Sequence, residues 1–389
     1  EIIRLMASAE QSRSRFVQIA DRLARIYSPA VHILAATTLA GCLIWTGGDW
    51  HSSLMAAIAV LIITCPCALG LAVPAVQTVA SGILFRNGVM IKDGAALEKL
   101  AGVDTVVFDK TGTLTLGRPH LANGSSITSS NLAIAAGLAH SSRHPLSRAV
   151  CEAARSRGIA PAIVEDVQEI PGRGLSASFQ GEPVRLGSRQ WCGIDENDGQ
   201  GLPEFVLMRN SKASSIFTFE DELRGDAAAV IAKLKSDGLR VEILSGDREI
   251  AVRRAASALG IEQWQAGVTP QQKLAYVEHL KAAGHKVLMV GDGLNDAPAL
   301  AAGLTSMAPS SATDIGRTAA DTIFMGESLQ PVLVARDVAI ATQRLSVQNF
   351  VLAVGYNVLA VPIAMLGFAS PLLAAVAMST SSIIVIGNS

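Results

Sequence analysis

Two cysteines flank a proline in the stretch I-T-C-P-C-A-L-G at residues 63–70, inside a long segment without charged side chains. In an unbroken α-helix, residues two apart point about 200° from each other, so Cys65 and Cys67 could not bind one ion together. Pro66 removes a backbone N–H and clashes with the preceding turn, so the helix must unwind there. Both sulfurs can then face one site, and thiolates suit soft ions such as Cu(I) and Zn(II). The alternative is a packing kink whose two thiols act as small apolar side chains.

Acidic side chains follow three short β-branched runs in the middle of the chain. The runs T-V-V-F-D (105–109), V-E-I-L-S-G-D (241–247) and K-V-L-M-V-G-D-G (286–293) look like buried parallel strands, and segments with helical apolar spacing separate them. This alternation predicts a doubly wound α/β sheet, in which ligands bind at the carboxyl ends of the strands. The polar residues at or just past those ends are Asp109, Ser245, Asp247, Asp292 and Asp296.

The bulk composition excludes several classes of protein. Half of the 389 residues are hydrophobic, which is too apolar for an ordinary soluble enzyme. The net charge of −1 offers no basic face, so nucleic acid is not expected as a partner. The five cysteines form no disulfide framework, which favours a reducing environment over a secreted fold.

The apolar residues gather near the two ends of the chain, whereas residues 86–344 have the composition of a soluble protein. A bilayer core needs about 20 apolar residues per helix. Uncharged stretches therefore predict four spans, at about 29–47, 53–83, 347–367 and 371–389. Basic residues flank the spans on one side only, which places that side and the middle insertion in the cytoplasm. We therefore predict a multi-pass protein of the cell membrane, with the lipid bilayer as a partner and cytoplasmic catalytic domains.

The stretch D-K-T-G-T-L-T at 109–115 resembles the phosphorylation motif of P-type ATPases, and three further motifs follow in family order. The resemblance implies that ATP phosphorylates Asp109, next to Lys110 and Thr111. A carboxylate can attack the terminal phosphoryl group and hold it as an acyl phosphate. Because an anion then attacks an anion, Mg²⁺ and a lysine are expected nearby.

The same resemblance assigns the remaining catalytic and Mg²⁺-binding residues. In G-D-G-L-N-D at 291–296, Asp292 and Asp296 offer the hard oxygen ligands that Mg²⁺ prefers. Asp109 and the backbone carbonyl of Thr111 complete the implied Mg²⁺ ligands. The other implied catalytic residues are Ser245 and Asp247, which stand where the family usually has T-G-D, Lys273 of T-P-Q-Q-K, and Asn295.

A more irregular stretch at 119–218 is interpreted as an inserted α+β nucleotide-binding domain. It contains a His-Pro pair typical of the heavy-metal branch of the family, and two glycines that would let the backbone approach adenine or phosphate closely. The implied ATP-binding residues are His144, Pro145, Gly172, Gly174 and Thr113. Two positions depart from the family pattern, since Ala139 replaces a usual Glu and Ser188 a usual Asn, so no nucleotide contact is assigned to them.

The C-P-C motif and the A-L-G-L-A-V-P that follows resemble the heavy-metal (type IB) P-type ATPases. Y-N at 356–357 and M-S-T-S-S at 378–382 resemble the copper(I) subgroup, and silver should also fit. No Asp, Glu, Lys or Arg occurs from 345 to 389, which argues against the zinc branch and its membrane Asp. The implied ligands of the transported Cu(I) are Cys65, Cys67, Tyr356, Asn357, Met378 and Ser382.

The expected function is thus ATP-driven export of copper(I), with a copper donor chaperone as a partner. The chain contains no T-G-E, the motif of the family's actuator domain, so we interpret it as a fragment that could accept a phosphoryl group but not turn over alone. The alternatives are a Zn/Cd/Co pump, a membrane-anchored haloacid dehalogenase-like phosphatase, and a copper-binding membrane protein without activity. The expected parts are a lead-in at 1–28, two membrane helices at 29–85, a phosphorylation domain at 86–118 and 219–330, the nucleotide-binding domain at 119–218, and two membrane helices at 331–389.

Overall fold

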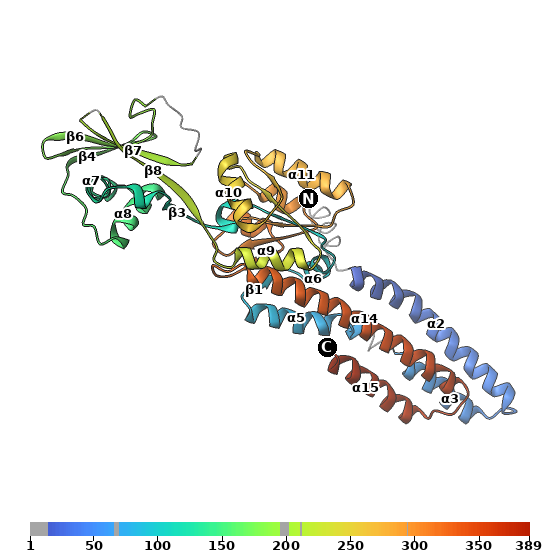
Figure 1. Cartoon of the computed structure of the whole chain (residues 1–389). Helices are drawn as coiled ribbons and strands as arrows, with labels where there is room; N and C mark the ends of the chain where they lie inside the picture. The colour runs from blue at the N-terminus through green and yellow to red at the C-terminus, as the bar shows by residue number, and fades with distance from the viewer. Residues whose placement is uncertain (1–14, 66–69, 195–201, 211, 294) are drawn as a thin grey trace. The chain divides into compact units, whose positions relative to one another are not determined.

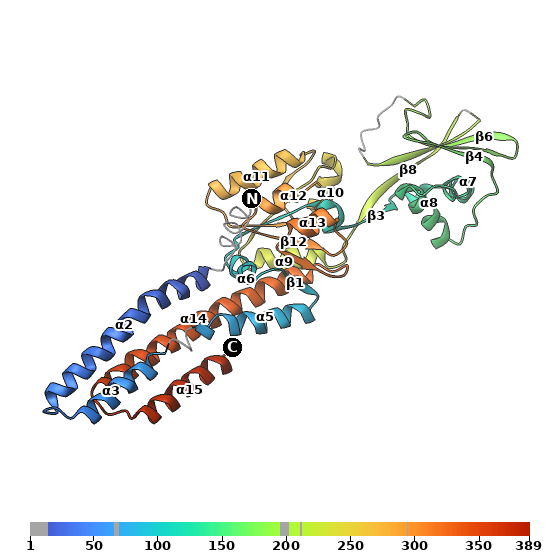
Figure 2. The same ribbon diagram turned by 180° about the vertical axis from the view of Figure 1, so that it is seen from behind.

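The computed structural model describes residues 15–65, 70–194, 202–210, 212–293 and 295–389, with side chains from residue 29 onward. The chain divides into two compact units. A helical unit comprises residues up to 103, 321–324 and 331–389, and an α/β unit comprises 104–320 and 325–330. Figure 1 and, from behind, Figure 2 show the elements of each unit.

The helical unit is built from apolar helices that lie alongside one another (Figures 1 and 2). Helix α3 contacts both α2 and α15. Small side chains such as Ala35, Ala59, Ala364 and Ala374 fill the core between them, which lets the helix backbones approach closely. The elements are α2 (Arg15–Trp45), α3 (Trp50–Ile63), α5 (Pro74–Arg86), α6 (Gly94–Ala101), α14 (Gln330–Met365), α15 (Pro371–Gly387) and the antiparallel strands β1 (Val89–Ile91) and β13 (Thr322–Phe324).

The predicted span at 53–83 is interrupted. Helix α3 ends at Ile63, and α5 begins only at Pro74, which occupies the first turn of a helix where its missing N–H costs nothing. The end of α3 directly before the C-P-C motif agrees with the helix-breaking effect of a proline. Cys65 follows this helix end, whereas Pro66 and Cys67 lie outside the described residues.

Among the described residues, α14 is the one helix long and apolar enough by length and composition to cross a membrane. The apolar segments Pro29–Trp45, Trp50–Ile63 and Pro371–Gly387 are shorter than a full span. The four-span arrangement therefore stays a prediction from the sequence.

Five parallel strands form the centre of the α/β unit, in the order β12, β11, β2, β9, β10. Val107 pairs with Met289 on one side and with Glu242 on the other. Apolar residues of these strands and of α11, including Val277, form the core. The elements are β2 (Thr105–Phe108), the loop η1 (Lys110–Leu114), α9 (Ala227–Ser236), β9 (Arg240–Leu244), α10 (Glu249–Leu259), β10 (Gln263–Gln265), α11 (Pro270–Ala282), β11 (Val287–Val290), α12 (Ala297–Ala302), β12 (Thr305–Pro309) and α13 (Asp314–Ala319).

An inserted lobe interrupts this sheet after η1. Its antiparallel sheet has the order β3, β8, β7, β6, β5, β4, and α7 and α8 pack on it around Leu132, Val150 and Phe217. The predicted fold, a doubly wound α/β domain with an inserted α+β domain, is confirmed. The elements are β3 (Thr115–Leu121), η2 (Gly124–Ser126), α7 (Ser129–Ala139), α8 (Pro145–Ser156), β4 (Glu165–Ile170), β5 (Gly174–Phe179), β6 (Glu182–Gly187), β7 (Glu204–Arg209) and β8 (Lys212–Leu223).

Candidate functional site

The carboxyl ends of three neighbouring parallel strands carry the predicted polar residues. Asp109 directly follows β2, and its backbone N–H donates to the carbonyl of Val290, the last residue of β11, at 2.8 Å. Ser245 directly follows β9, and Asp292 comes two residues after β11. Because the three strands are parallel neighbours, these residues meet at one edge of the sheet, where ligands of such folds bind.

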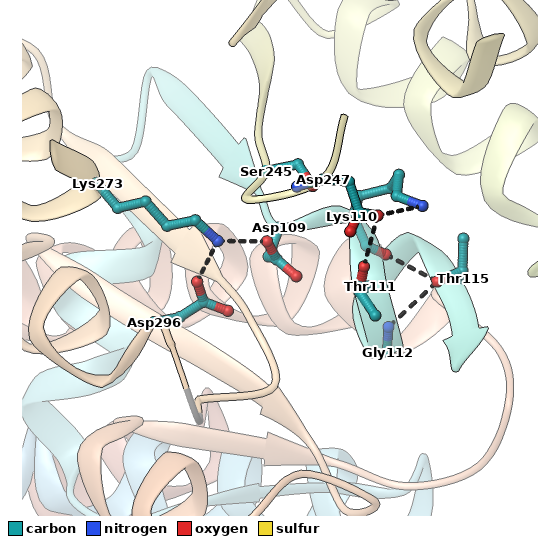
Figure 3. Close-up of polar contacts among 9 residues, drawn as sticks. All are labelled: Asp109, Lys110, Thr111, Gly112, Thr115, Ser245, Asp247, Lys273 and Asp296. Atoms are coloured by element: carbon teal, nitrogen blue, oxygen red, sulfur yellow. Dashed lines mark hydrogen bonds and ion pairs between the residues drawn. The ribbon is translucent and has the colours of Figure 1, made fainter. Parts of the chain in front are cut away.

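Lys273 lies between two of the carboxylates (Figure 3). Its Nζ is 2.6 Å from Oδ1 of Asp109 and 2.6 Å from Oδ1 of Asp296. All three side chains are almost fully buried. A capping box between Thr269 and Gln272 fixes the first turn of α11, the turn that presents Lys273. The lysine is therefore held in place by its own helix before any ligand arrives.

Burial and charge both shift the proton affinities in this cluster. Burial, followed by the negative charge of Asp296, raises the pKa of Asp109 to about 7, although Lys273 opposes the rise. Burial disfavours the charged form of Lys273, but Asp109 and Asp296 outweigh it and hold the pKa of that ammonium above its ordinary value. Lys273 thus stays protonated, and one ammonium faces several carboxylates. The single ammonium therefore does not balance the negative charge of the carboxylates in the cluster.

The carboxylates fit a divalent cation. Asp109, Asp292 and Asp296 each offer an oxygen, and these oxygens lie within 4.8 Å of one another. Opposite ligands of an octahedral Mg²⁺ stand about 4.2 Å apart, so small side-chain rotations suffice. Gly112 leaves room for the cluster, because a Cβ there would lie 2.8 Å from Oδ2 of Asp292. The backbone of Gly112 also has φ +69°, which favours glycine.

The loop after Asp109 is tied to the end of β9 (Figure 3). The ammonium of Lys110 is 2.5 Å from Oδ2 of Asp247, and the hydroxyl of Thr111 donates to the same oxygen at 3.0 Å. Asp247 is held in turn, since its backbone N–H donates to the hydroxyl of the buried Ser245 at 3.2 Å. The predicted catalytic residues of the two strand ends are thus brought together by direct contacts. Asn295 is exposed beside them.

No role was predicted from the sequence for Arg224, which binds backbone carbonyls of the loop η1. Its guanidinium donates to the carbonyls of Thr113 at 2.6 Å, Gly112 at 3.1 Å and Gly326 at 3.2 Å, and the residue is only 4% exposed. Thr113 itself is fully buried, and its hydroxyl has no hydrogen-bond partner among the described residues. The signal in the sequence was a lone arginine within the acidic stretch E-D-E-L-R-G-D at 220–226.

Arg224→Lys is expected to slow phosphorylation of Asp109 and to lower the thermal unfolding midpoint. A lysine is a single point donor and cannot reach three carbonyls, so at least one charged hydrogen bond is lost, at a cost of about 1.5–3 kcal/mol. Differential scanning calorimetry and rapid-quench phosphorylation check this. Arg155→Lys is the control, because Arg155 pairs with Glu152 on an exposed helix face. Equal behaviour of the two variants would contradict this role of Arg224.

The inserted lobe positions the predicted nucleotide residues by its own packing. His144 caps α8, its Nδ1 accepting from the N–H of Leu146 at 3.3 Å, and Pro145 occupies the first turn. Gly172 has φ +73° with open space around it. A Cβ at Gly174 would lie 2.4 Å from the carbonyl of Leu186, so close strand packing by itself requires a glycine there.

A cleft of about 680 Å³ opens beside the loop η1 that follows Asp109. This volume is in the range of small-molecule sites. Basic and acidic groups line one part of the cleft and apolar side chains of the inserted lobe another. The lining includes Lys110, Thr111, Leu146, Phe219, Asp247 and Arg248.

The predicted metal ligands of the helical unit come from three segments. On α14, the hydroxyl of Tyr356 and Oδ1 of Asn357 are buried and have no hydrogen-bond partner among the described residues. Tyr356 packs on the cluster that contains the last turn of α3, just before Cys65. On α15, the predicted ligands are Met378 and Ser382, whose hydroxyl donates to the Met378 carbonyl at 3.2 Å. Cys67 lies outside the described residues.

Known proteins of similar sequence and structure identify the family to which this fold and site belong. Residues 103–303 match the haloacid dehalogenase-like hydrolase family. The whole chain aligns with 51% of the length of the nitrogen fixation protein FixI of Rhizobium leguminosarum bv. viciae, at 52% identity. It also aligns with 52% of the length of a copper-exporting P-type ATPase of Mycobacterium tuberculosis, at 37% identity. The chain therefore spans about half the length of each relative. A crystal structure of a zinc-transporting PIB-type ATPase in its E2.Pi state matches the whole chain over 66% of its own length, with a TM-score of 0.84 and 31% identity.

Proposed function

The chain belongs to the haloacid dehalogenase-like hydrolases and, within them, to the P-type ATPases of the heavy-metal (PIB) class, and we propose that it forms the catalytic half of a pump that moves copper(I) out of the cytoplasm. The carrying observation is the Asp109–Lys273–Asp296 cluster at the strand ends of a P-type ATPase fold. As P-type ATPases are membrane enzymes that hydrolyse ATP, the chain is placed at a membrane; its multi-pass arrangement and the cell membrane are part of the proposal.

In the proposed reaction, Asp109 attacks the γ-phosphorus of ATP. The new bond joins a carboxylate oxygen to phosphorus, while the bond between phosphorus and the bridging oxygen of ADP breaks and ADP leaves with the electron pair. Lys273 is already in contact with Asp109 and offsets the negative charge that gathers there. Lys110 and Thr111, anchored on Asp247, lie on the cleft from which the nucleotide would approach.

Mg²⁺ held by Asp109, Asp292, Asp296 and the Thr111 carbonyl would supply the remaining positive charge. Nucleotide recognition would fall to His144, Pro145, Gly172 and Gly174 of the inserted lobe, together with Thr113 of the loop.

Several features support copper(I) as the transported ion, bound by Cys65, Cys67, Tyr356, Asn357, Met378 and Ser382. Thiolates and a thioether are soft ligands that suit Cu(I), and silver(I) shares this chemistry. The oxygens of Tyr356 and Asn357 are buried and have no hydrogen-bond partner in the part of the chain that the structure describes, so they are available to bind an ion. A divalent ion would need more negative charge, yet residues 345–389 contain no acidic side chain. A zinc-type ion stays the second candidate, because the matching crystal structure is of a zinc transporter. A cytoplasmic copper donor protein is the partner that this function would require.

Phosphoenzyme formation from ATP in the full-length protein is the deciding measurement. We expect Cu(I) and Ag(I), but not Zn(II), to raise the steady-state phosphoenzyme. Cys65→Ser should reduce that metal response by about tenfold or more, because a hydroxyl is a poor ligand for a soft ion. Phosphorylation by inorganic phosphate, which needs no metal at the membrane site, should persist in this variant.

The control is Cys42→Ser, which changes a thiol of the same unit that donates to the Met365 carbonyl on α14. It should keep the metal response. Activation by Zn(II) alone would replace copper with the zinc alternative, and no metal response in the parent protein would contradict the proposal.

A further inference from the structure

A buried amide joins three segments of the helical unit. Asn349 of α14 is completely inaccessible to solvent. Its Nδ2 donates to the carbonyl of Ala72 at 3.3 Å and to the hydroxyl of Ser389 at 2.9 Å, while its Oδ1 accepts from Nδ2 of Asn388 at 2.9 Å. The amide therefore uses both its donor and its acceptor atoms, and it joins α14 to the residue Ala72 before α5 and to the two residues that follow α15.

The contact with Ala72 serves a turn of the backbone just before α5. Ala72 lies in this turn, two residues before Pro74, and it is fully buried. A buried backbone carbonyl outside a helix costs several kcal/mol in an apolar environment unless a donor reaches it. Asn349 supplies that donor. Ala72 also packs against Ala353 of α14 and Val385 of α15, so apolar packing and hydrogen bonding act on the same point.

Asn349 shares a helix face with a candidate metal ligand. Asn349 and Tyr356 are seven residues apart on α14, which is about two turns, so they lie on one face of that helix with a rise of about 10.5 Å. Its partners Asn388 and Ser389 directly follow α15, the helix that carries Ser382. Ala72, like Cys65, lies between α3 and α5. All three segments that carry proposed ligands thus meet at Asn349.

We propose that Asn349 is a positioning residue for metal binding: it fixes the backbone after the C-P-C motif against α14 and α15, and so sets the affinity for the transported ion. This inference rests on the proposed function for the role of that ion. Asn349 does not itself bind the metal, since its polar atoms are already engaged.

The first test compares Asn349→Leu with the parent in the full-length protein. Leucine keeps the approximate volume and removes both hydrogen-bonding groups. We expect the Cu(I) concentration for half-maximal phosphorylation to rise by about tenfold, the effect of losing one or two buried interhelical hydrogen bonds. The KM for ATP and the phosphorylation by inorganic phosphate should be unchanged, because the change lies in the metal path alone.

Thr342→Val is the matched control. Thr342 lies on the same helix, is also buried, and its hydroxyl donates to the carbonyl of Val338 within that helix. It should leave the Cu(I) dependence unchanged. Asn388→Leu provides an independent variant, since it removes the donor to Asn349 Oδ1. It should shift the Cu(I) dependence in the same direction, and the double variant should be no worse than Asn349→Leu.

Hydrogen exchange of residues 70–76 separates this inference from the proposed function. We expect faster amide exchange in Asn349→Leu than in the parent, with or without Cu(I). If the parent shows no Cu(I) response, the proposed function fails while the exchange result still decides whether Asn349 holds this segment. Unchanged exchange, an unchanged Cu(I) dependence, or an equal shift in Thr342→Val would overturn the inference. If Asn349→Leu does not fold, Asn388→Leu decides by the same criteria.

Discussion

Asp109→Asn is expected to abolish the phosphoenzyme formed from ATP in the full-length protein. The carboxylate is the nucleophile of the proposed reaction, and an amide cannot form the acyl phosphate. Removing a nucleophile that works within a catalytic unit lowers rates by about 10³-fold or more, which takes the signal to background. Acid-stable incorporation of radiolabelled phosphate from ATP measures it. Asp314→Asn is the control, because Asp314 is exposed and pairs with Arg317 at the surface.

The same variant should fold at least as well as the parent when Mg²⁺ is absent. Burial and Asp296 raise the pKa of Asp109 from 3.8 to about 7, so the folded state binds the proton more tightly than the unfolded state. The stability from this group is therefore full below pH 3.8 and is lost as the pH rises towards 7. Asparagine carries no charge, so the unfolding midpoint of the variant relative to that of the parent should increase as the pH rises over this range. A lower midpoint across the range would contradict the described electrostatics.

The strand-end residues could be predicted from the sequence because their position follows from topology. Short apolar runs ending in Asp109, Ser245 and Asp292 predict parallel strands, and parallel neighbours bring their carboxyl ends to one edge. The structure confirms the sheet and brings these residues together. Family resemblance was needed for Lys273, since no local pattern links it to a carboxylate 164 positions earlier in the chain.

Contacts to backbone atoms escaped prediction for a physical reason. Arg224 binds backbone carbonyls. Because every residue has a backbone carbonyl, the amino-acid types in the sequence do not indicate which residues such an arginine contacts. Asn349 is similar, because it binds the carbonyl of Ala72, which lies in a buried turn before α5. Pro66 predicted that the helix would end near it, but the points at which α3 ends, at Ile63, and α5 begins, at Pro74, depend on tertiary packing.

Lys273→Met is expected to lower both stability and phosphorylation. The substitution leaves Asp109 and Asp296 buried without the ammonium that contacts both. Removing one partner of a buried ion pair costs about 3–5 kcal/mol, because the remaining charge is left uncompensated. For an α/β unit of this size each kcal/mol lowers the midpoint by about 2–4 °C, so we expect a fall of about 10 °C. Phosphorylation of Asp109 by ATP should slow by about 10²-fold, since a positioned charge is lost. Calorimetry and rapid-quench assays measure the two effects.

Two further variants identify charge as the cause. Adding Asp296→Asn to Lys273→Met removes one of the two opposed carboxylates, so it should recover part of the lost midpoint without restoring phosphorylation. Mg²⁺ should stabilise Lys273→Met more than the parent, because the carboxylates then lack any other cation. Lys233→Met is the control, as Lys233 pairs with Asp237 at an exposed position. An unchanged midpoint in Lys273→Met would mean that the ammonium does not hold the two carboxylates together, and the phosphorylation chemistry proposed here would lose its central cation.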